Sequence, residues 1–238
     1  MGGDERHGSA RARPKVMWCG YRAWSDRLLE SVKTGGRADI VKCVADPHAF
    51  VEFMDSATDV DVVILAGWSW KIPEAVVKRL PCVGLHPSDL PKYRGGSPLQ
   101  HQIIDGLTET QCSLFLLSAE FDEGPVLAKA PMSLAGNMDD IFAELVRVGA
   151  ALLNQVLADW PNWRYQRQDD AAGFERKRRK PEESRLDRQM FQTHSLREIY
   201  NIVRALGDPY PNAYIEDEQG NRLLFKVVAF ESGSNEGS

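Results

Sequence analysis

The chain has 238 residues, of which 43% are hydrophobic and 26% are charged, and its net charge is −5. This composition is typical of a soluble globular protein with a full core, and the acidic balance excludes a general basic field for nucleic acid. No uninterrupted apolar run approaches the roughly 20 residues that a membrane-spanning helix needs, so we expect no membrane partner. The four cysteines form no CxxC pair, which indicates reduced thiols, a cytoplasmic location and no metal site.

In the first half of the chain, short apolar segments alternate with amphipathic ones. Residues 1–14 precede them and combine glycine, serine and charge without an apolar segment, so we expect a disordered tail there. The predicted strands cover residues 16–19, 40–44, 60–66 and 82–85, and the predicted helices cover residues 25–33, 50–54 and 74–80. Strands and helices that alternate at this pace predict βαβ units and an α/β fold with a parallel-rich sheet.

The second half continues with helices and strands and ends in a predicted hairpin. A helix is expected from Pro98 to Gly106 with Ser97 as its N-cap, and a long amphipathic helix over 138–157 is expected to begin at Asn137 or Asp139. The other predicted elements are strands at 112–118 and 126–132, an exit strand and linker at 160–174, a helix at 195–207, and hairpin strands at 213–216 and 223–230. The edge strand of such a hairpin can pair with the sheet of a second copy of the chain, so a homodimer is one expected assembly.

The most informative stretch is residues 84–96, which read GLHPSDLPKYRGG. His86 follows an apolar run, and Pro87 and Pro91 stiffen the turn behind it. Open α/β sheets place their chemistry on turns at the carboxyl ends of buried strands. The pattern therefore predicts an active-site loop.

Asp122 is the expected partner of His86. It also follows an apolar run, so both side chains are expected at the carboxyl edge of neighbouring strands. A carboxylate beside a histidine fixes its tautomer and makes it a competent base near neutral pH. Gly124 allows a tight turn and a close approach of a ligand to the backbone. The residues alone leave open a buried structural histidine with an ordinary turn aspartate.

The stretch from His86 to Pro98, HPSDLPKYRGGSP, resembles the signature loop of the formyltransferases that use N10-formyltetrahydrofolate. Methionyl-tRNA formyltransferases and sugar N-formyltransferases are the members most similar in layout. The family's essential aspartate lies in a turn that matches FDEG at 121–124. The resemblance covers residues 14 to 232. It implies a Rossmann-like formyltransferase domain at 15–165, a linker at 166–194 and a small C-terminal helix–hairpin subdomain at 195–232.

The resemblance also implies roles for particular residues. His86 assists the attack of an amine as a base, and Asp122 orients it and relays protons. The proline-bounded loop and the backbone before Asp122 are expected to hold the folate. The residues expected to contact N10-formyltetrahydrofolate are Ser88, Leu90, Arg94, Gly95, Leu117, Phe121 and Ile72.

One catalytic position departs from the family's pattern. The family's asparagine, two residues before the histidine, is Gly84 here. That amide donates to the formyl oxygen, and loss of one such donor costs roughly 10²–10³ in rate. The outcomes are a substitute donor (water, Ser88, Gln102 or His101), a slow enzyme, or a folate-binding protein or formyl-folate hydrolase without transferase activity. We expect a substitute donor because the rest of the motif is intact.

The expected acceptor is a small-molecule amine, with an amino sugar, nucleotide-linked or nonulosonate, as the first choice. Too little chain follows the linker for the C-terminal barrel of the tRNA enzymes, and no basic surface favours a nucleic-acid partner. The charge run ERKRRKP at 175–181 is interpreted as a solvated face of the linker. A formyltransferase for another amine, such as a hydroxamate precursor, or for methionyl-tRNA is the alternative.

The acceptor side is expected to include residues after the first and third strands. Arg22 can pair with a phosphate or carboxylate, and Tyr21 or Trp24 can stack on a ring, although Trp24 equally fits a core anchor. Trp68 and Trp70 are expected to line the pocket, although one of them equally fits a packing role because Pro73 is close in sequence. The predicted acceptor residues are Tyr21, Arg22, Trp68, Trp70, His101 and Gln102.

Overall fold

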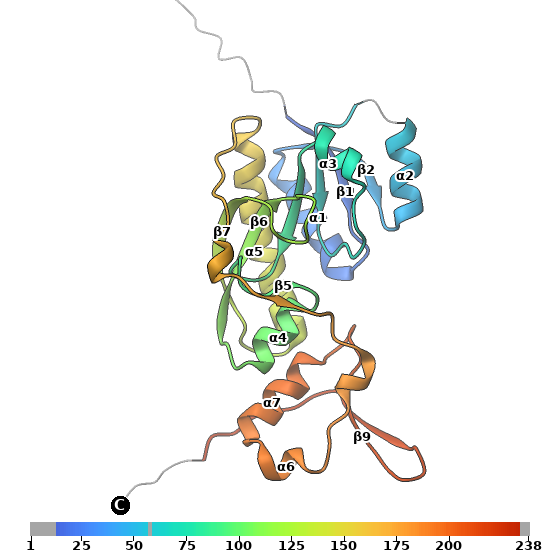
Figure 1. Ribbon diagram of the computed structural model, residues 1–238, viewed down its shortest axis with the longest axis vertical. Coiled ribbons are helices and arrows are strands. Elements are labelled where there is room, and N and C mark those ends of the chain that lie inside the picture. The colour runs from blue at the N-terminus through green and yellow to red at the C-terminus, as the bar shows by residue number, and fades with distance from the viewer. Residues whose placement is uncertain (1–12, 57–58, 234–238) are drawn as a thin grey trace, which may run out of the picture.

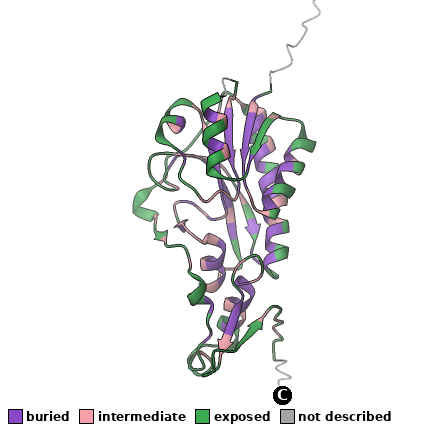
Figure 2. Ribbon diagram, turned by 90° about the vertical axis from the view of Figure 1, so that its right-hand side faces the viewer, coloured by how far each residue is buried: buried purple, intermediate pink, exposed green. Residues whose placement is uncertain are grey.

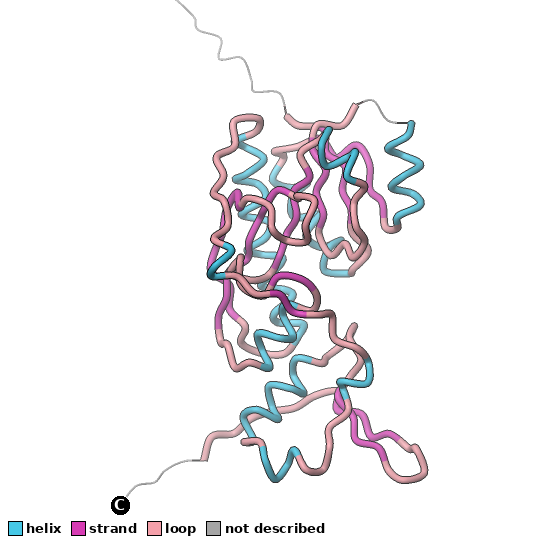
Figure 3. The backbone as a smooth tube through the Cα atoms, in the orientation of Figure 1, coloured by secondary structure: helices cyan, strands magenta, loops and turns pink. Residues whose placement is uncertain are grey.

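The computed structural model describes residues 13–56 and 59–233, so the expected tail at 1–14 lies almost wholly outside the described residues. Its centre is a six-stranded sheet with the strand order β2-β1-β3-β4-β6-β7 (Figure 1). A smaller C-terminal part, with helices and a two-stranded hairpin, lies at one end of the molecule (Figure 1, Figure 3). The predicted α/β fold with a small appended hairpin is confirmed.

The first half alternates strands and helices as predicted. The strands β2, β1, β3 and β4 pair in parallel in that order. His86 is the last residue of β4 rather than the first residue of the turn. The elements are β1 (Lys15–Cys19), α1 (Ala23–Gly35), β2 (Asp39–Val44), α2 (Pro47–Ser56), β3 (Val62–Leu65), α3 (Glu74–Arg79) and β4 (Cys82–His86).

The second half makes the sheet mixed. The strand β6 is antiparallel to β4, and β7 is antiparallel to β6. The predicted parallel-rich sheet is therefore confirmed for four of the strands of this sheet. The elements are β5 (Arg94–Gly95), α4 (Pro98–Ile104), β6 (Glu109–Leu116), β7 (Val126–Ser133), α5 (Met138–Asp159), β8 (Glu175–Arg176), α6 (Met190–Thr193), α7 (Leu196–Ala205), β9 (Ala213–Glu216) and β10 (Arg222–Phe225).

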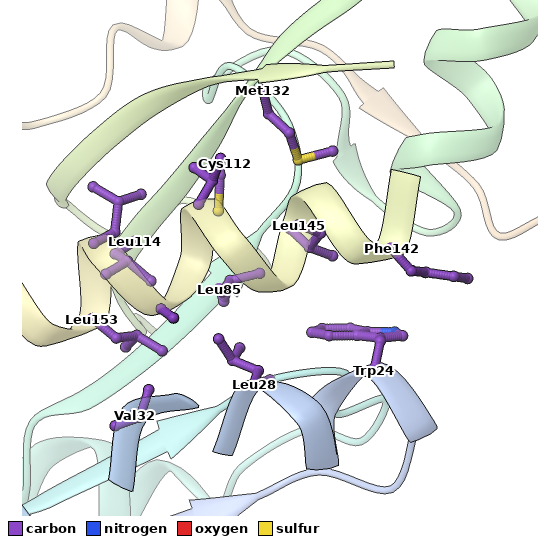
Figure 4. Packing of buried hydrophobic residues seen from close by; sticks show 14 of the residues in the cluster. Trp24, Leu28, Val32, Leu85, Cys112, Leu114, Met132, Phe142, Leu145 and Leu153 are labelled. Atoms are coloured by element: carbon purple, nitrogen blue, oxygen red, sulfur yellow. The ribbon is translucent and has the colours of Figure 1, made fainter. Parts of the chain in front are cut away.

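Helices cover both faces of the sheet, and the strands are buried between them (Figure 2). Side chains alternate along β1, so Val16 and Trp18 join the cluster under α1 and α5, whereas Met17 and Cys19 join the cluster under α2 and α3. Figure 4 shows the larger cluster, where helices α1 and α5 pack their side chains against β4, β6 and β7. This double cover explains why the strands read as continuous apolar runs.

The long helix α5 is a core helix. Asn137 caps it by accepting from the amide of Asp140, whose carboxylate accepts from the amide of Asn137 in return. Length and composition alone would let α5 cross a membrane, but most of its apolar window is buried, and the helix packs against α1 and β7. The sequence predicted no segment long and apolar enough to cross a membrane, and this prediction is wrong for residues 138–159. In the structure this helix is long and apolar because it packs in the core.

The segment after α5 differs most from prediction. Residues 160–174 contain no strand beyond an isolated bridge between Gln166 and Val126. Instead β8 pairs with β5, which brings the linker against the Arg-Gly-Gly sequence. The expected N-cap Ser97 has a left-handed backbone and makes no cap hydrogen bond, because its Oγ accepts from the amide of Arg179. The second hairpin strand ends at Phe225, short of the predicted residue 230.

Candidate active site

His86 is buried at the end of β4 and is held by a backbone carbonyl. Its Nε2 lies 2.8 Å from the carbonyl oxygen of Tyr93. A carbonyl only accepts, so Nε2 carries a hydrogen and the neutral ring has its free lone pair on Nδ1. The Nδ1 atom lies 3.5 Å from Oδ2 of Asp122. The two expected catalytic side chains therefore meet, and Nδ1 is the atom able to take a proton.

Asp122 reaches His86 by a different route from the expected one. Because β6 is antiparallel to β4, its last residue, Leu116, pairs with Val83, whereas His86 pairs with Ser113 near the middle of β6. The strand end therefore lies away from the carboxyl edge of β4. The segment 117–122 folds back along the sheet and carries Asp122 to the histidine.

The turn around Asp122 depends on its backbone conformation. Asp122 has a φ of +56°, in the left-handed region that non-glycine residues rarely adopt. A Cβ on Gly124 would lie 1.6 Å from the carbonyl oxygen of Leu116, so only glycine fits there. The turn is strained and tightly packed, as expected where a fold positions a functional carboxylate.

Asp122 is fixed by two groups that lie far from it in sequence. Its Oδ2 accepts from the amide of Gly95 at 2.8 Å, so the Arg-Gly-Gly sequence serves the aspartate. The Nε2 of Gln168 donates to the carbonyl oxygens of Asp122 and Gly124 at 2.6 and 2.7 Å. The Oε1 of Gln168 accepts from Arg94. Sequence reasoning missed Gln168, because an isolated glutamine in an aperiodic segment carries no signal.

A cavity of about 660 Å³ opens beside this pair. It lies between the sheet, the linker and the C-terminal part, and Tyr210 contributes to its wall. Trp24 also lines it, but this side chain is buried and stacks on Phe142 at 6.2 Å, which supports the core-anchor alternative. The predicted residues that line the cavity are Arg22, Trp68, Trp70, Ile72, Gly84, His86, Gly95, Leu117, Phe121 and Asp122.

Three of the residues predicted to contact the folate do not line the cavity. Ser88 is fully buried, and its hydroxyl donates to the carbonyl of Lys92. Leu90 is buried in the loop. The Arg94 guanidinium is buried and bonds Gln168 and Asp170 instead. These side chains stiffen the loop from within, which is why they share the motif with residues that face the cavity.

Three of the predicted acceptor residues also lie outside the cavity wall. His101 is bonded through Nε2 to the carbonyl of Lys177, and Gln102 is buried, where it donates to the carbonyls of Pro87 and Pro98. Tyr21 lies behind the wall, with its ring 4.9 Å from that of Trp70. Helix α4 thus turns His101 and Gln102 towards the loop and linker that it supports.

Phe115 fills the space beside Gly84. A Cβ on Gly84 would lie 2.6 Å from Cε1 of Phe115 and 3.0 Å from Cδ1 of Leu117. The three side chains expected as substitute donors are not there: carbon atoms lie where a Cβ on Gly84 would be, and Ser88, His101 and Gln102 make their hydrogen bonds elsewhere. The sequence expectation of a replacement amide or hydroxyl at this position is wrong for these three side chains.

The cavity wall also contains two linker residues that were not among the predicted site residues. Arg178 and Arg179, from the charge run interpreted as a solvated linker face, both line the cavity. Arg178 is exposed, as that interpretation expects, and Arg179 is half-buried; both nevertheless reach the cavity because β8 brings the linker across the Arg-Gly-Gly sequence. In the part of the chain that the structure describes, no group of three or more His, Cys, Asp or Glu residues is placed to hold a metal ion.

Comparisons with known proteins agree with this geometry. The family model for formyl transferase matches residues 44–144. The methionyl-tRNA formyltransferase of Novosphingobium aromaticivorans is 34% identical over 179 residues, which cover 74% of this chain and 57% of that protein. The chain therefore spans a little over half the length of this curated relative.

Solved structures share the fold. Methionyl-tRNA formyltransferase from Clostridium thermocellum has a TM-score of 0.79 at 24% identity, over 93% of this chain and 95% of that one. A sugar N-formyltransferase from a Shewanella species has a TM-score of 0.72 at 16% identity, over 92% and 99% of the two chains. HypX from Aquifex aeolicus in complex with tetrahydrofolic acid has a TM-score of 0.70 at 19% identity, over 86% and 36%. The solved structures show the shared fold, and the match to the formyl transferase family comes from the sequence, over residues 44–144 and in relatives such as the Novosphingobium protein.

Proposed function

We propose that this protein transfers a formyl group from N10-formyltetrahydrofolate to the amine of a small molecule, with an amino sugar, nucleotide-linked or nonulosonate, as the acceptor class. The observation that carries the proposal is the pair of His86 and Asp122, 3.5 Å apart, at the wall of a cavity of about 660 Å³. A base with a nearby carboxylate, facing a cavity of the size that small ligands occupy, is what amine acylation needs.

In the proposed reaction, Nδ1 of His86 carries out the proton transfers. The attacking amine gains positive charge as its nitrogen bonds the formyl carbon, so it must lose a proton. Nδ1 accepts that proton, and the resulting imidazolium lies between the Tyr93 carbonyl and the Asp122 carboxylate. His86 then returns the proton to the nitrogen that leaves as its bond to the formyl carbon breaks. The formyl group itself comes from N10-formyltetrahydrofolate.

The cavity suits a folate on its apolar side. Leu65, Ile72, Val77 and Leu117 line it, and they offer flat apolar surface to a pterin ring. The indole Nε1 of Trp68 is buried and has no partner among the described residues, so it is a donor available to a ligand. HypX, a protein of the same fold, binds tetrahydrofolic acid. Gly95 and Phe121 lie on the same cavity wall and stay in the proposed folate set.

Net charge supports a small acceptor. A tRNA acceptor is favoured by a basic surface, whereas this chain carries a net charge of −5. Chain length does not separate the two classes, because the chain covers 95% of a methionyl-tRNA formyltransferase structure and 99% of a sugar N-formyltransferase structure. Methionyl-tRNA is the second candidate acceptor, since sequence relatives carry that name. A cytoplasmic location and a homodimer remain predictions.

The contact of Phe115 with Gly84 favours one alternative function. A Cβ on Gly84 would meet the Phe115 ring, so we infer that this position supplies no donor to the formyl oxygen, and we expect slower transfer. His86 and Asp122 are equally able to activate water. A formyl-folate hydrolase, or a folate-binding protein without turnover, is therefore the alternative.

Turnover of N10-formyltetrahydrofolate tests these functions directly. Tetrahydrofolate release is measured without acceptor, with a panel of nucleotide-linked amino sugars, and with methionyl-tRNA. Release that depends on an amino sugar supports the proposal. Release without acceptor identifies the hydrolase, folate binding without release identifies the binding protein, and release that depends on methionyl-tRNA replaces the small acceptor.

A further inference from the structure

Three arginines line the same cavity as the catalytic pair, and we name them the arginine cluster: Arg22, Arg178 and Arg179. Arg22 directly precedes α1, whereas the other two belong to the linker. We propose that the arginine cluster binds a phosphate or diphosphate group carried by the amine acceptor. The inference rests on the proposed function and assigns residues that recognise the acceptor.

The linker arginines are placed by the glycines of the catalytic loop. A Cβ on Gly96 would lie 2.4 Å from Cα and 2.5 Å from Cβ of Arg178. The linker can therefore cross the loop this closely only because residue 96 is a glycine. The amide of Arg179 donates to Oγ of Ser97 at 3.1 Å. The same glycine sequence therefore fixes Asp122 on one side, through Gly95, and the two arginines on the other.

Hydroxyl groups join Arg178 to Arg22. Arg178 donates to Oγ of Ser69 at 3.3 Å, and Ser69 lies 2.6 Å from the hydroxyl of Tyr21. The guanidinium carbon of Arg22 lies 4.6 Å from the centre of the Tyr21 ring. Both arginines also act on the hydroxyl of Tyr210: burial raises its pKa, and the two positive charges oppose that rise. The two guanidinium groups therefore belong to one locality.

None of the three arginines has an ion-pair partner among the described residues. Their recorded partners are neutral: the Ser69 hydroxyl, the Tyr21 ring and the carbonyl of Glu183, to which Arg179 donates at 2.6 Å. The Nε of Arg179 is buried and has no partner within the described ranges. The carboxylates that line the same cavity, Glu120, Asp122 and Glu175, make no ion pair with the cluster. Its hydrogen-bond donors therefore remain available to an anion.

The number of donors favours phosphate over carboxylate. A carboxylate offers two oxygens, which one guanidinium can satisfy as a bidentate pair. A phosphate offers three acceptor oxygens, and a diphosphate offers more, so it can engage guanidinium groups from separate segments. Arg22 is the N-cap residue of α1, so the positive end of the helix dipole lies beside it.

Binding of inorganic pyrophosphate to the full chain, measured by calorimetry at low salt, tests the subsite without folate or turnover. We expect Arg22→Gln and Arg178→Gln each to weaken the affinity about tenfold or more, because charge-assisted hydrogen bonds are lost. Arg179→Gln is expected to weaken it less, since this guanidinium already donates to a carbonyl. The matched control is Lys177→Gln, in the same charge run but outside the cavity wall, with an expected change below about twofold.

Two results overturn the subsite. One is pyrophosphate binding that is absent in the wild type, or equal in Arg178→Gln and Lys177→Gln. The other is malonate, a dicarboxylate, binding as tightly as pyrophosphate and with the same dependence on Arg22 and Arg178. Thermal unfolding of each variant confirms folding. Folate binding is measured on the same samples. A wild-type protein that does not bind folate rejects the proposed function. Folate-dependent turnover that is intact in the wild type and unchanged by the arginine substitutions rejects only the subsite.

Discussion

The catalytic pair and the arginine cluster, which line the same cavity, differ in whether the protein supplies partners for their polar groups. On the catalytic side, Nε2 of His86, Oδ2 of Asp122 and both ends of the Gln168 amide have protein partners. On the side of the arginine cluster, three positive charges have no carboxylate partner among the described residues. Groups that must hold one geometry during proton transfer are fixed in advance, and groups that recognise a ligand keep donors free for it. We call the groups held around His86 and Asp122 the fixed side, and substitutions there are expected to change catalysis most.

The largest expected effect comes from removing the charge of Asp122. Asp122→Asn keeps the size of the side chain but withdraws the carboxylate beside Nδ1 of His86. We expect kcat to fall about a thousandfold, since positioned acid–base groups contribute 10²–10⁴. Steady-state tetrahydrofolate release measures it. Glu123→Gln is the control: it removes an exposed carboxylate next to Asp122 and its 3.5 Å ion pair with Arg94, which keeps its bonds to Gln168 and Asp170, so we expect kcat to stay within about threefold of wild type.

A fall of equal size in both variants would contradict the prediction, because it would reflect the turn rather than the charge. If kcat were unchanged in Asp122→Asn, the carboxylate would have no catalytic role, and the contrast with the arginine cluster would no longer hold.

The second expected effect comes from restoring an asparagine at Gly84, where the Phe115 ring lies close to the backbone. Gly84→Asn forces a Cβ to within 2.6 Å of the Phe115 ring, and we expect a loss of about 1–3 kcal/mol in the free energy of unfolding. Urea unfolding measures it. Adding Phe115→Val is expected to make room for the new side chain, so turnover of the double variant reports on the amide.

A gain in turnover in the double variant over Phe115→Val alone would show that the donor to the formyl oxygen is limiting. Equal turnover in these two proteins would show that the amide is dispensable here. Gly84→Asn with unchanged stability would contradict the packing argument.

A smaller effect is expected from Gln168, a positioning residue. Gln168→Leu removes the hydrogen bonds to the Asp122 and Gly124 carbonyls and to Arg94. Loosening the turn misplaces the carboxylate, so we expect kcat to fall about tenfold, with little change in the KM for the folate. Gln166→Leu, an exposed glutamine on the same segment, is the matched control. A change confined to thermal stability, with kcat and its pH profile intact, would make Gln168 merely structural.

The sequence predicted local features and missed those that depend on distant packing. The β4 strand, His86 and the proline-bounded turn follow from neighbouring residues, and they were correct to within one residue. The route of Asp122 was wrong because strand direction is set by pairing with β4, which no local pattern states. The content of the space beside Gly84 depends on the side chain of Phe115, on a neighbouring strand. The charge run indicated only a solvated face, because the approach of its arginines to the cavity depends on the β5–β8 pairing.

The smallest expected effect comes from Tyr93, whose carbonyl holds His86 and whose side chain lies elsewhere. Its hydroxyl donates to Asp105 at 2.9 Å, and burial, followed by this hydrogen bond, raises its pKa to about 12. Tyr93→Phe keeps the carbonyl, so we expect kcat at neutral pH to be unchanged and the free energy of unfolding to fall by about 1 kcal/mol, the value of one hydrogen bond.

The pH dependence distinguishes this variant from a simple loss of packing. Between pH 10 and about 12 the unfolded wild-type chain releases the Tyr93 proton while the folded protein keeps it, so the stability of the wild type falls with rising pH. Tyr93→Phe lacks this contribution, and the stability gap between the two proteins should close above pH 10. Burial also raises the pKa values of Cys82 and Cys112 to about 12, and both proteins share that decline. A gap that stays constant from pH 7 to pH 11 in urea unfolding would contradict the prediction, whereas an altered kcat at neutral pH would show that the side chain helps to hold the carbonyl of the fixed side.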